Sequence, residues 1–191
     1  GCQDAIEDLD DDNDDVEDGE DSCPVGDLSW SSTSGTDHDA DGCQDALEDT
    51  DDDNDGILDS SDDCQDGDLG WTPSSSTDYD SDGCQDSGED TDDDNDNVDD
   101  TADACQLGAL GWTSTAATDN DGDGCADASE DTDDDNDGIS DASDNCSSGD
   151  SNWTPGPLTD YDSDGCQDSG EDDDDDNDGV IDNNDNCPKG N

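Results

Sequence analysis

Aspartates at alternate positions, repeated at a fixed spacing, constrain this chain more than any other feature. Within 78–89, acidic residues occupy positions 1, 3, 5, 9 and 12, and glycine occupies position 6. A second run of the same spacing begins three residues later, over 92–103, with Asn97 at position 6. Carboxylates brought together by a tight turn repel one another unless a cation lies between them. The spacing therefore predicts a chain that folds around ions.

Twelve-residue loops with this spacing are typical of EF-hand-type calcium sites. In such loops the side chains at positions 1, 3, 5, 9 and 12 and the backbone carbonyl at position 7 coordinate the ion, and position 6 turns the chain back. Calcium suits this all-oxygen set better than magnesium, which demands stricter geometry. An EF-hand also needs flanking amphipathic helices, and no segment here has a sustained helical period. We therefore predict EF-hand-like loops without flanking helices.

The loops recur with a period of 41 residues. Gly-Cys pairs mark the period, and they begin at Gly1, Gly42, Gly83, Gly124 and Gly165. The chain divides into repeats at 1–41 (with a truncated first loop), 42–82, 83–123 and 124–164, and a partial fifth at 165–191. Each such unit contacts chiefly its neighbours, so length can grow without a larger core. Because both ends fall inside a repeat, we expect an excerpt of a longer array.

Both loops of each repeat are predicted to bind metal, and we call the pair with its linking residues a double loop. Valine, isoleucine and cysteine offer their backbone carbonyls. In the first loop the candidate ligands are Asp4 and Glu7; Asp37, Asp39, Asp41, Cys43, Asp45 and Glu48; Asp78, Asp80, Asp82, Cys84, Asp86 and Glu89; Asp119, Asp121, Asp123, Cys125, Asp127 and Glu130; and Asp160, Asp162, Asp164, Cys166, Asp168 and Glu171. In the second loop they are Asp10, Asp12, Asp14, Asp18 and Asp21; Asp51, Asp53, Asp55, Ile57, Asp59 and Asp62; Asp92, Asp94, Asp96, Val98, Asp100 and Asp103; Asp133, Asp135, Asp137, Ile139, Asp141 and Asp144; and Asp174, Asp176, Asp178, Val180, Asp182 and Asp185.

At least two calcium ions per repeat are expected from these ligands. One further aspartate lies between the two loops of each copy and leaves room for an additional ion shared between neighbours. The linking residues are Asp8, Asp49, Asp90, Asp131 and Asp172.

Positions 6 and 7 of the second loop have residues suited to a turn and to packing. Position 6 is glycine in three copies and Asp15 or Asn97 in the others, and these residue types tolerate the left-handed conformation best after glycine. Position 7 is valine or isoleucine in every copy, and we expect these side chains to pack inward between loops. They are Val16, Ile57, Val98, Ile139 and Val180.

Composition rules out an ordinary hydrophobic core. The 191 residues have a formal net charge of −66, and only 23% are hydrophobic. Such a balance is typical of disordered chains. The fixed ligand spacing and the cysteines, however, are not typical of disordered chains. Order must therefore come from metal and disulfides. With a single basic residue, Lys189, the chain cannot bind nucleic acid directly, and no membrane-spanning segment is predicted.

Ten cysteines indicate an oxidising, extracellular setting. Zinc is disfavoured, since the chain has no Cys-x-x-Cys pair and one histidine. Pairing within a double loop (Cys43–Cys64) and pairing across the following segment (Cys64–Cys84) enclose similar lengths, so loop-closure entropy does not separate them. We favour the first pairing because it uses every cysteine, and cross-links between chains remain open. The cysteines are Cys2, Cys23, Cys43, Cys64, Cys84, Cys105, Cys125, Cys146, Cys166 and Cys187.

A spacer such as 64–77, rich in Gly, Ser, Thr and Pro, joins each double loop to the next. Each spacer has one tryptophan, which we expect to pack on a neighbouring repeat, with a contact to another chain as the alternative. The tryptophans are Trp30, Trp71, Trp112 and Trp153.

Short strands are expected around 69–71 or 109–112, and a turn of helix at 86–90. We interpret His38 as a solvated loop residue, because tyrosine or asparagine replaces it in the other copies.

The run Asp-Gly-Val-Ile-Asp-Asn-Asn-Asp-Asn-Cys-Pro at 178–188 resembles the thrombospondin type 3 repeat, whose units read D-x-D-x-D-G-x-x-D-x-x-D-N-C-P. The resemblance covers both loops and the second cysteine of every repeat, although Asn-Cys occurs only at 145–146 and 186–187. It implies an almost helix-free chain wrapped around a row of calcium ions, with disulfides as clips and metal ligation at the loop positions above. The strict period and the tryptophan spacer depart from the animal family and look more like repeat arrays of microbial secreted or surface proteins. Dockerin modules share the loop, but the helix that follows it there is absent here.

These observations predict an elongated, calcium- and disulfide-stabilised tandem-repeat array with little regular secondary structure. We expect an extracellular stalk or filament, secreted or part of a cell-surface appendage, that self-associates into a filament or bundle. One alternative is an adhesion module that presents tryptophan and tyrosine to a glycan or another cell-surface partner, and another is a calcium reservoir or mineral-nucleating polymer. No catalytic residue is predicted, because no pair of carboxylates has the shaped pocket and contrasting environments that catalysis needs.

Overall fold

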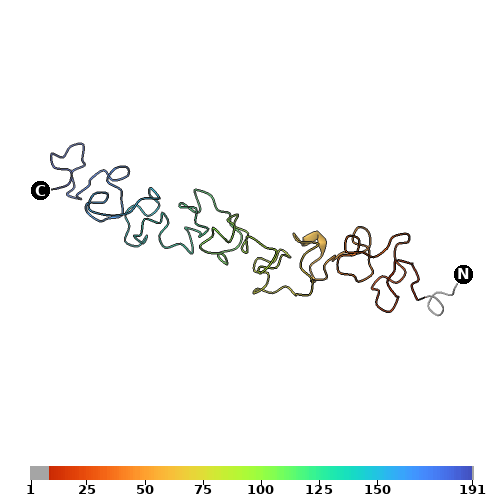
Figure 1. Ribbon diagram of the computed structural model, residues 1–191. Helices are drawn as coiled ribbons and strands as arrows, with labels where there is room; N and C mark the ends of the chain where they lie inside the picture. The colour runs from red at the N-terminus through yellow and green to blue at the C-terminus, as the bar shows by residue number, and fades with distance from the viewer. Residues whose placement is uncertain (1–8, 191) are drawn as a thin grey trace. The chain divides into compact units, whose positions relative to one another are not determined.

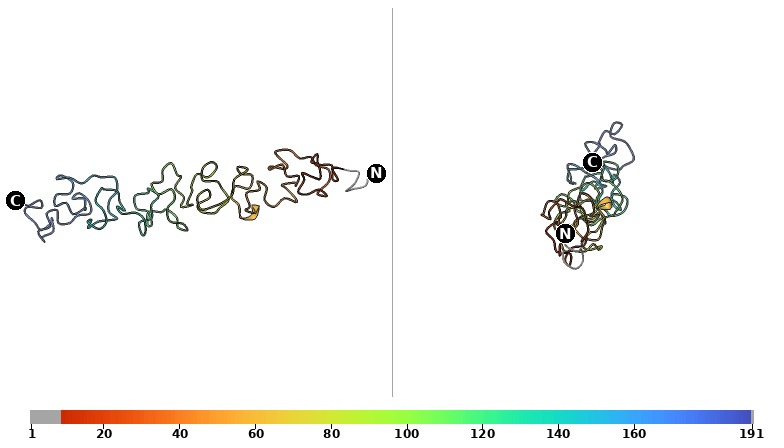
Figure 2. Two further views of the ribbon diagram at one scale, coloured as in Figure 1. Left: turned by 90° about the horizontal axis from the view of Figure 1, so that it is seen from below. Right: turned by 90° about the vertical axis from the view of Figure 1, so that its right-hand side faces the viewer.

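The computed structural model describes residues 9–190, and almost none of that length is regular secondary structure. Its one assigned element is η1, a 3-10 turn at Asp59–Ser61 (Figure 1). Two further views of the described residues likewise show neither sheet nor long helix (Figure 2). The strands expected around 69–71 and 109–112 do not form. Gly70 (φ 83°) and Gly111 (φ 79°) have left-handed backbone conformations that interrupt both extended segments.

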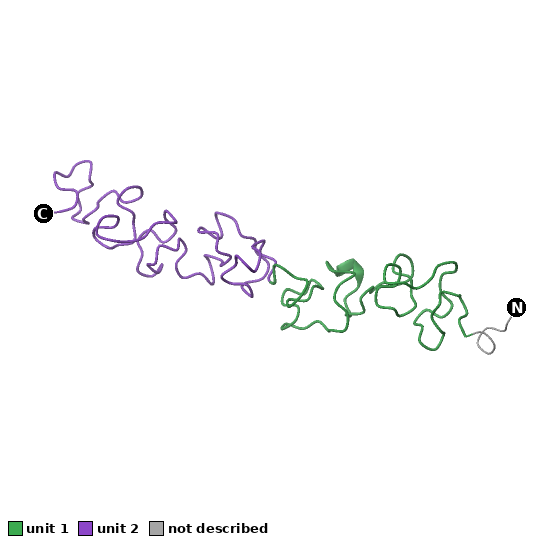
Figure 3. Ribbon diagram, in the orientation of Figure 1, with its two compact units in different colours: residues 1–93 green, residues 94–191 purple. Residues whose placement is uncertain are grey.

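The chain forms two compact units, residues 1–93 and residues 94–191 (Figure 3). The same local architecture recurs in both: a double loop, then a spacer whose first cysteine is joined by a disulfide to the cysteine at position 7 of the next first loop. Nothing helical in residues 9–190 has the length and apolar character that a membrane crossing requires. The prediction of a disulfide-stabilised repeat array with little regular structure is confirmed.

Each first loop ends in one hydrogen-bonded turn. The N–H groups of Gly88, Glu89 and Asp90 all donate to the carbonyl of Gln85, over 3.0–3.2 Å. The turn expected at 86–90 therefore forms, but it does not continue into a helix. The Asp92 N–H donates to Oδ1 of the linking residue Asp90 (3.0 Å) and not to a carbonyl one helical turn back.

Left-handed backbone conformations make the loops tight. At position 6 of the second loop, Gly56 has φ 104°, Asp15 has φ 82° and Asn97 has φ 75°, which confirms the conformation predicted for that position. Position 4 is left-handed as well, as at Asn54 (φ 56°) and at Ala40 in the first loop (φ 62°). Asparagine stands at position 4 of the second loop in all five copies, a signal that the sequence analysis did not use.

The disulfides close the spacers, so the expected pairing within each double loop is wrong. Asp21–Cys23 runs beside Asp41–Cys43, with the Ser22 N–H donating to the Asp41 carbonyl (2.7 Å). This backbone contact, which loop-closure entropy does not report, brings the two cysteines together. The bridges are Cys23–Cys43, Cys64–Cys84, Cys105–Cys125 and Cys146–Cys166, each with a sequence separation of 20. Cys2 lies outside the described residues.

Carboxylates and cystines, not aliphatic side chains, fill the interior. The buried hydrophobic residues in the described part are Ala126 and four disulfide-bonded cysteines. The valine and isoleucine residues at position 7 do not pack inward as expected, since Val180 is 42% exposed and the others are only half-buried. The nine largest fully buried side chains are all aspartates: Asp14, Asp37, Asp53, Asp78, Asp94, Asp96, Asp119, Asp135 and Asp160.

The spacer tryptophans are half-buried within the chain. Trp112, for example, lines an apolar recess with Leu110 of its own spacer and with Ala126 of the following loop. The tryptophan therefore lies against the next first loop, as expected for packing within the array.

Candidate metal centres

The first loop gathers its position 1, 3 and 5 carboxylates around a turn. Oxygens of Asp37, Asp39 and Asp41 lie within 4.8 Å of one another. Asp37, which is 1% exposed, accepts hydrogen bonds from the backbone N–H of Asp41 (3.0 Å) and of Gly42 (3.2 Å). Asp119 accepts the same two bonds in its copy, from Asp123 and Gly124. Asp4 and Glu7 of the truncated copy lie outside the described residues.

The second loop builds the same kind of cluster. Oxygens of Asp51, Asp53 and Asp55 lie within 4.8 Å of one another, as do those of the equivalent residues at 10, 12 and 14. The Ile57 N–H donates to Oδ1 of Asp55 (2.6 Å), which fixes the position 5 carboxylate. Asp62 at position 12 lies near enough to this cluster to be affected by its charges. Burial, with the charges of Asp53 and Asp55, raises its pKa to about 6, although the hydrogen bond from Cys64 opposes the shift.

Many of the buried oxygens have no hydrogen-bond donor. They include Oδ2 of Asp55, Asp137 and Asp160, each at position 5 or 1 of a loop. A buried carboxylate without a partner costs several kcal/mol, and the chain has only one basic residue to offer. The candidate metal ligands are all hard oxygen atoms, which suit a hard divalent cation. These clusters could therefore hold metal ions.

Position 9 closes each loop in addition to any ligand role. Oδ1 of Asp45 accepts the His38 N–H (3.0 Å), and Oδ1 of Asp59 accepts the Asp52 N–H (3.0 Å). Each bond joins position 2 to position 9, so the two ends of the loop stay together. One oxygen of the position 9 carboxylate is used in this way, and the other remains for a neighbouring cluster.

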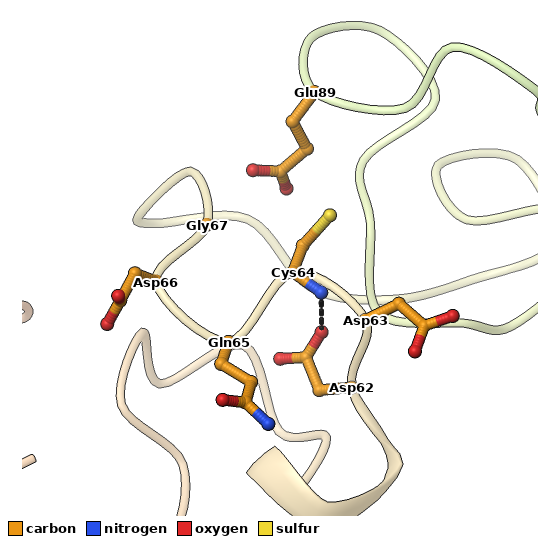
Figure 4. A pocket seen from close by; sticks show the side chains of 7 residues that line it. All are labelled: Asp62, Asp63, Cys64, Gln65, Asp66, Gly67 and Glu89. Carbon is orange, nitrogen blue, oxygen red and sulfur yellow. Dashed lines mark hydrogen bonds between the residues drawn. The ribbon is translucent and has the colours of Figure 1, made fainter. Parts of the chain in front are cut away.

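Glutamate at position 12 of the first loop reaches backward to the spacer. Oε1 of Glu89 accepts the Gln85 N–H (3.0 Å), and Oε2 accepts the Asp68 N–H (2.7 Å). Figure 4 shows the Glu89 and Asp62 side chains approaching the Cys64–Gly67 turn from different sides, with Asp62 accepting the Cys64 N–H (2.7 Å). Ligation of the loop's own cation by this glutamate remains a prediction, while its contact with the turn was missed by the sequence analysis.

The same turn is held by the second loop that precedes it. The Gly67 N–H donates to Oδ2 of Asp53 (3.2 Å), and the Gly26 N–H donates to Oδ2 of Asp12 (2.8 Å). Position 3 aspartates therefore serve both the metal cluster and the spacer turn. This bond joins the cluster of the second loop directly to the spacer turn that follows it.

Asparagine at position 4 of the second loop joins the two loops of a pair. The Asn54 side-chain amide donates to Asp39 and to Asp41, at positions 3 and 5 of the first loop. Asn136 makes the equivalent bonds to Asp121 and Asp123. A neutral donor between two carboxylates lowers their repulsion without occupying the cation's place.

His38 is not the solvated residue that was expected. It is half-buried, and its Nε2 lies 2.9 Å from the carbonyl oxygen of Gly67, in the next spacer turn. Asn120 at the same position donates to the carbonyl of Gly149 (3.2 Å). The hydrogen bond to Gly67 raises the pKa of His38, and nearby carboxylates act in the same direction. The position is filled by hydrogen-bonding side chains in every complete copy, a signal from which this contact could have been predicted.

No model of a known protein family matches the chain, and no curated protein matches it in sequence. The regular disulfides and clustered aspartates themselves support a metal-binding, disulfide-rich repeat. Multiple disulfides are typical of proteins from oxidising, extracellular-type environments.

Proposed function

We propose that the chain is a calcium-binding structural repeat protein, related to thrombospondin type 3 repeats, that forms an extracellular stalk or filament. Rows of Ca²⁺ in the double loops stiffen the chain, and disulfides fix each spacer. Self-association of several chains gives the filament or bundle. The role is mechanical, with no catalytic step.

One observation carries this proposal: the largest fully buried side chains are all aspartates. In an ordinary domain those places belong to aliphatic and aromatic residues. Carboxylates in such number stay buried only if cations enter with them, so the free energy of ion binding is also the free energy of folding.

Calcium suits the clusters better than other dications do. The loops are flexible twelve-residue turns that offer carboxylate and carbonyl oxygens, and Ca²⁺ accepts six to eight such ligands in irregular geometry. Mg²⁺ requires a near-ideal octahedron and loses its water reluctantly. Extracellular calcium modules bind in the range of about 0.1–1 mM, which matches a secreted protein.

Calcium titration of the purified chain tests the proposal. Native mass spectrometry in volatile buffer should count at least two Ca²⁺ per repeat, and small-angle scattering should report compaction along the titration and its reversal by EGTA. Magnesium at the same concentration serves as the control and should give far less compaction. A chain whose scattering profile is the same in calcium and in EGTA would contradict the proposal.

An adhesion module remains the second candidate, and exposed leucines in the spacers favour it. Leu28 is 69% exposed, and Leu69 and Leu110 are each 51% exposed, two residues before a tryptophan in each case. Such side chains could contact a partner or another copy of the chain. Electron microscopy of the calcium-loaded protein separates the candidates. Ordered fibres support the filament, and isolated short rods support adhesion. In the calcium titration, ion uptake without defined stoichiometry supports a reservoir.

A further inference from the structure

A third carboxylate cluster lies between the two loops of a pair. Oxygens of Asp45, Asp49 and Asp52 lie within 4.8 Å of one another. Asp45 is at position 9 of the first loop, Asp49 links the loops, and Asp52 is at position 2 of the second loop. Position 2 has no ligand role in the twelve-residue pattern, so Asp52 distinguishes this cluster from the two loop sites, although Asp45 is shared with the first loop.

The cluster contains buried carboxylate oxygens that lack a donor. Asp52 is 8% exposed, and its Oδ1 has no hydrogen-bond partner. Asp134, the equivalent residue in another copy, is 9% exposed, and its Oδ1 is in the same state. Oδ2 of the linking residues Asp49 and Asp131 is also buried without a donor. Burial and the neighbouring charges, Asp59 and Asp45 foremost, raise the pKa of Asp52 to about 7.

In the last double loop a cation stands at this place, and the chain itself supplies it. Lys189 is the only lysine or arginine in the sequence, and its Nζ contacts Oδ2 of Asp168 and lies 3.6 Å from Oδ2 of Asp175. Asp168 and Asp175 are the counterparts of Asp45 and Asp52. Their side chains are 5% and 7% exposed. The ammonium group thus marks the cluster as a place where positive charge is stabilised.

The residue at the position of Lys189 varies from copy to copy. Asp66, in the spacer that follows the double loop 37–62, stands at the position of Lys189, and in Figure 4 its carboxylate points away from that of Glu89. Its charge adds to burial in raising the pKa of both Asp45 and Asp52, so it faces the third cluster. Ser148 stands at the same position in another copy, and its hydroxyl donates to Oδ2 of Asp134 (3.2 Å). In these three copies the facing position lies toward the cluster with a negative, neutral or positive side chain, whereas Val25 and Leu107 stand at the same position in the other two copies and are exposed.

We propose that the cluster between the loops is a third divalent-cation site, and that the facing residue decides what occupies it. Asp66 supplies a fourth carboxylate and makes a strong calcium site. Ser148 leaves a three-carboxylate site of lower affinity. Lys189 replaces the ion with its own ammonium group, so the last double loop holds one Ca²⁺ fewer than the others. The inference rests on the proposed calcium binding and assigns a ligand role to Asp49, Asp52 and Asp66, which the loop pattern does not include.

Integer counting of bound Ca²⁺ tests the site in the full chain. Native mass spectrometry resolves single ions, so each variant is compared with the wild type in calcium acetate. Lys189→Ser should gain one ion, and Ser148→Lys should lose one. Asp52→Asn, which keeps the side chain's size, should also lose one. The exchange variant with both lysine changes should restore the wild-type count, because one ammonium has only moved between copies.

Matched controls separate a site-specific effect from a general change of charge. Ser75→Lys places the same charge in an exposed spacer and should leave the count unchanged. If Lys189→Ser gains no ion, or if Ser75→Lys and Ser148→Lys lose ions equally, the third site is wrong. The proposed function is judged separately, by whether the wild type binds at least two ions per repeat and by whether Asp55→Asn in a loop site loses one.

Discussion

The double loops and the spacers achieve order by different means, although they alternate along one chain. In the double loop 37–62 the interior is made of aspartates, and several of their buried oxygens have no hydrogen-bond donor. The spacer 64–77 has only two acidic residues, Asp66 and Asp68. There a disulfide closes the segment, and a hydroxyl turn, with Thr77 Oγ1 donating to the Thr72 carbonyl (3.1 Å), shapes it. The comparison teaches that segments built on clustered carboxylates alternate with segments closed by disulfides, and that under the proposed function only the first kind should depend on metal.

Calcium removal should give the largest difference between the two regions. In hydrogen exchange with the disulfides intact, EGTA should expose the loop amides of Asp41 and Gly42, whose acceptor Asp37 loses its cation partner. A site saturated at 100 times its Kd contributes about 2.7 kcal/mol, so their protection should fall about a hundredfold or more. Spacer amides such as that of Thr77 should change much less. Equal loss of protection in loops and spacers would show that the two regions are not independently stabilised.

Removal of one spacer disulfide should have the next largest effect, in the opposite region. Cys64→Ser with Cys84→Ser should lower the stability of that spacer by about 3 kcal/mol, the amount expected for a closed loop of this length. Calcium binding to the distant loops should be retained. The measurement is denaturant unfolding in saturating calcium, with hydrogen exchange to locate the change.

Thiol titration provides the control for that variant. The Cys64→Ser, Cys84→Ser pair should add no free thiol, whereas Cys43→Ser with Cys64→Ser should break two bridges and add two. If instead the first variant adds two thiols and the second adds none, the cysteines pair within the double loop, as Cys43–Cys64.

A smaller effect should come from the glycine at the junction of the two regions. A Cβ at Gly42 would overlap the carboxylate of Asp21, and the backbone there has φ 90°. Gly42→Ala should therefore cost about 1–2 kcal/mol from the left-handed conformation alone, with some additional cost from the displaced carboxylate. Gly19→Ala is the matched control, since its Cβ would meet nothing within 4 Å. Calcium-titration midpoints should shift for the first variant only, and a similar shift for both would remove the steric argument.

The local chemistry of the chain was predictable because it depends on residues close in sequence. Alternate aspartates specify where carboxylates converge, and Gly56, Asp15 and Asn97 identify the left-handed turn. The composition likewise excluded an aliphatic core, which the buried aspartates bear out. Each of these conclusions concerns a single loop of twelve residues or the average of the chain.

Contacts over 20–29 residues could not be predicted in this way. The pairing Cys23–Cys43 depends on how the end of one loop lies beside the centre of the next, and chain entropy gives no preference between the alternatives. The bond between His38 and Gly67 and the approach of Lys189 to Asp168 depend on the same stacking.

The sequence by itself thus determined that the chain forms tight turns lined by aspartates. It also determined that the chain has almost no positive side chains with which to balance them. Only the tertiary structure decided which turns are joined, which oxygens remain without a donor, and where the single lysine lies. The physical reason is that turn geometry follows from neighbouring residues, whereas the sharing of carboxylates between turns depends on their arrangement in space.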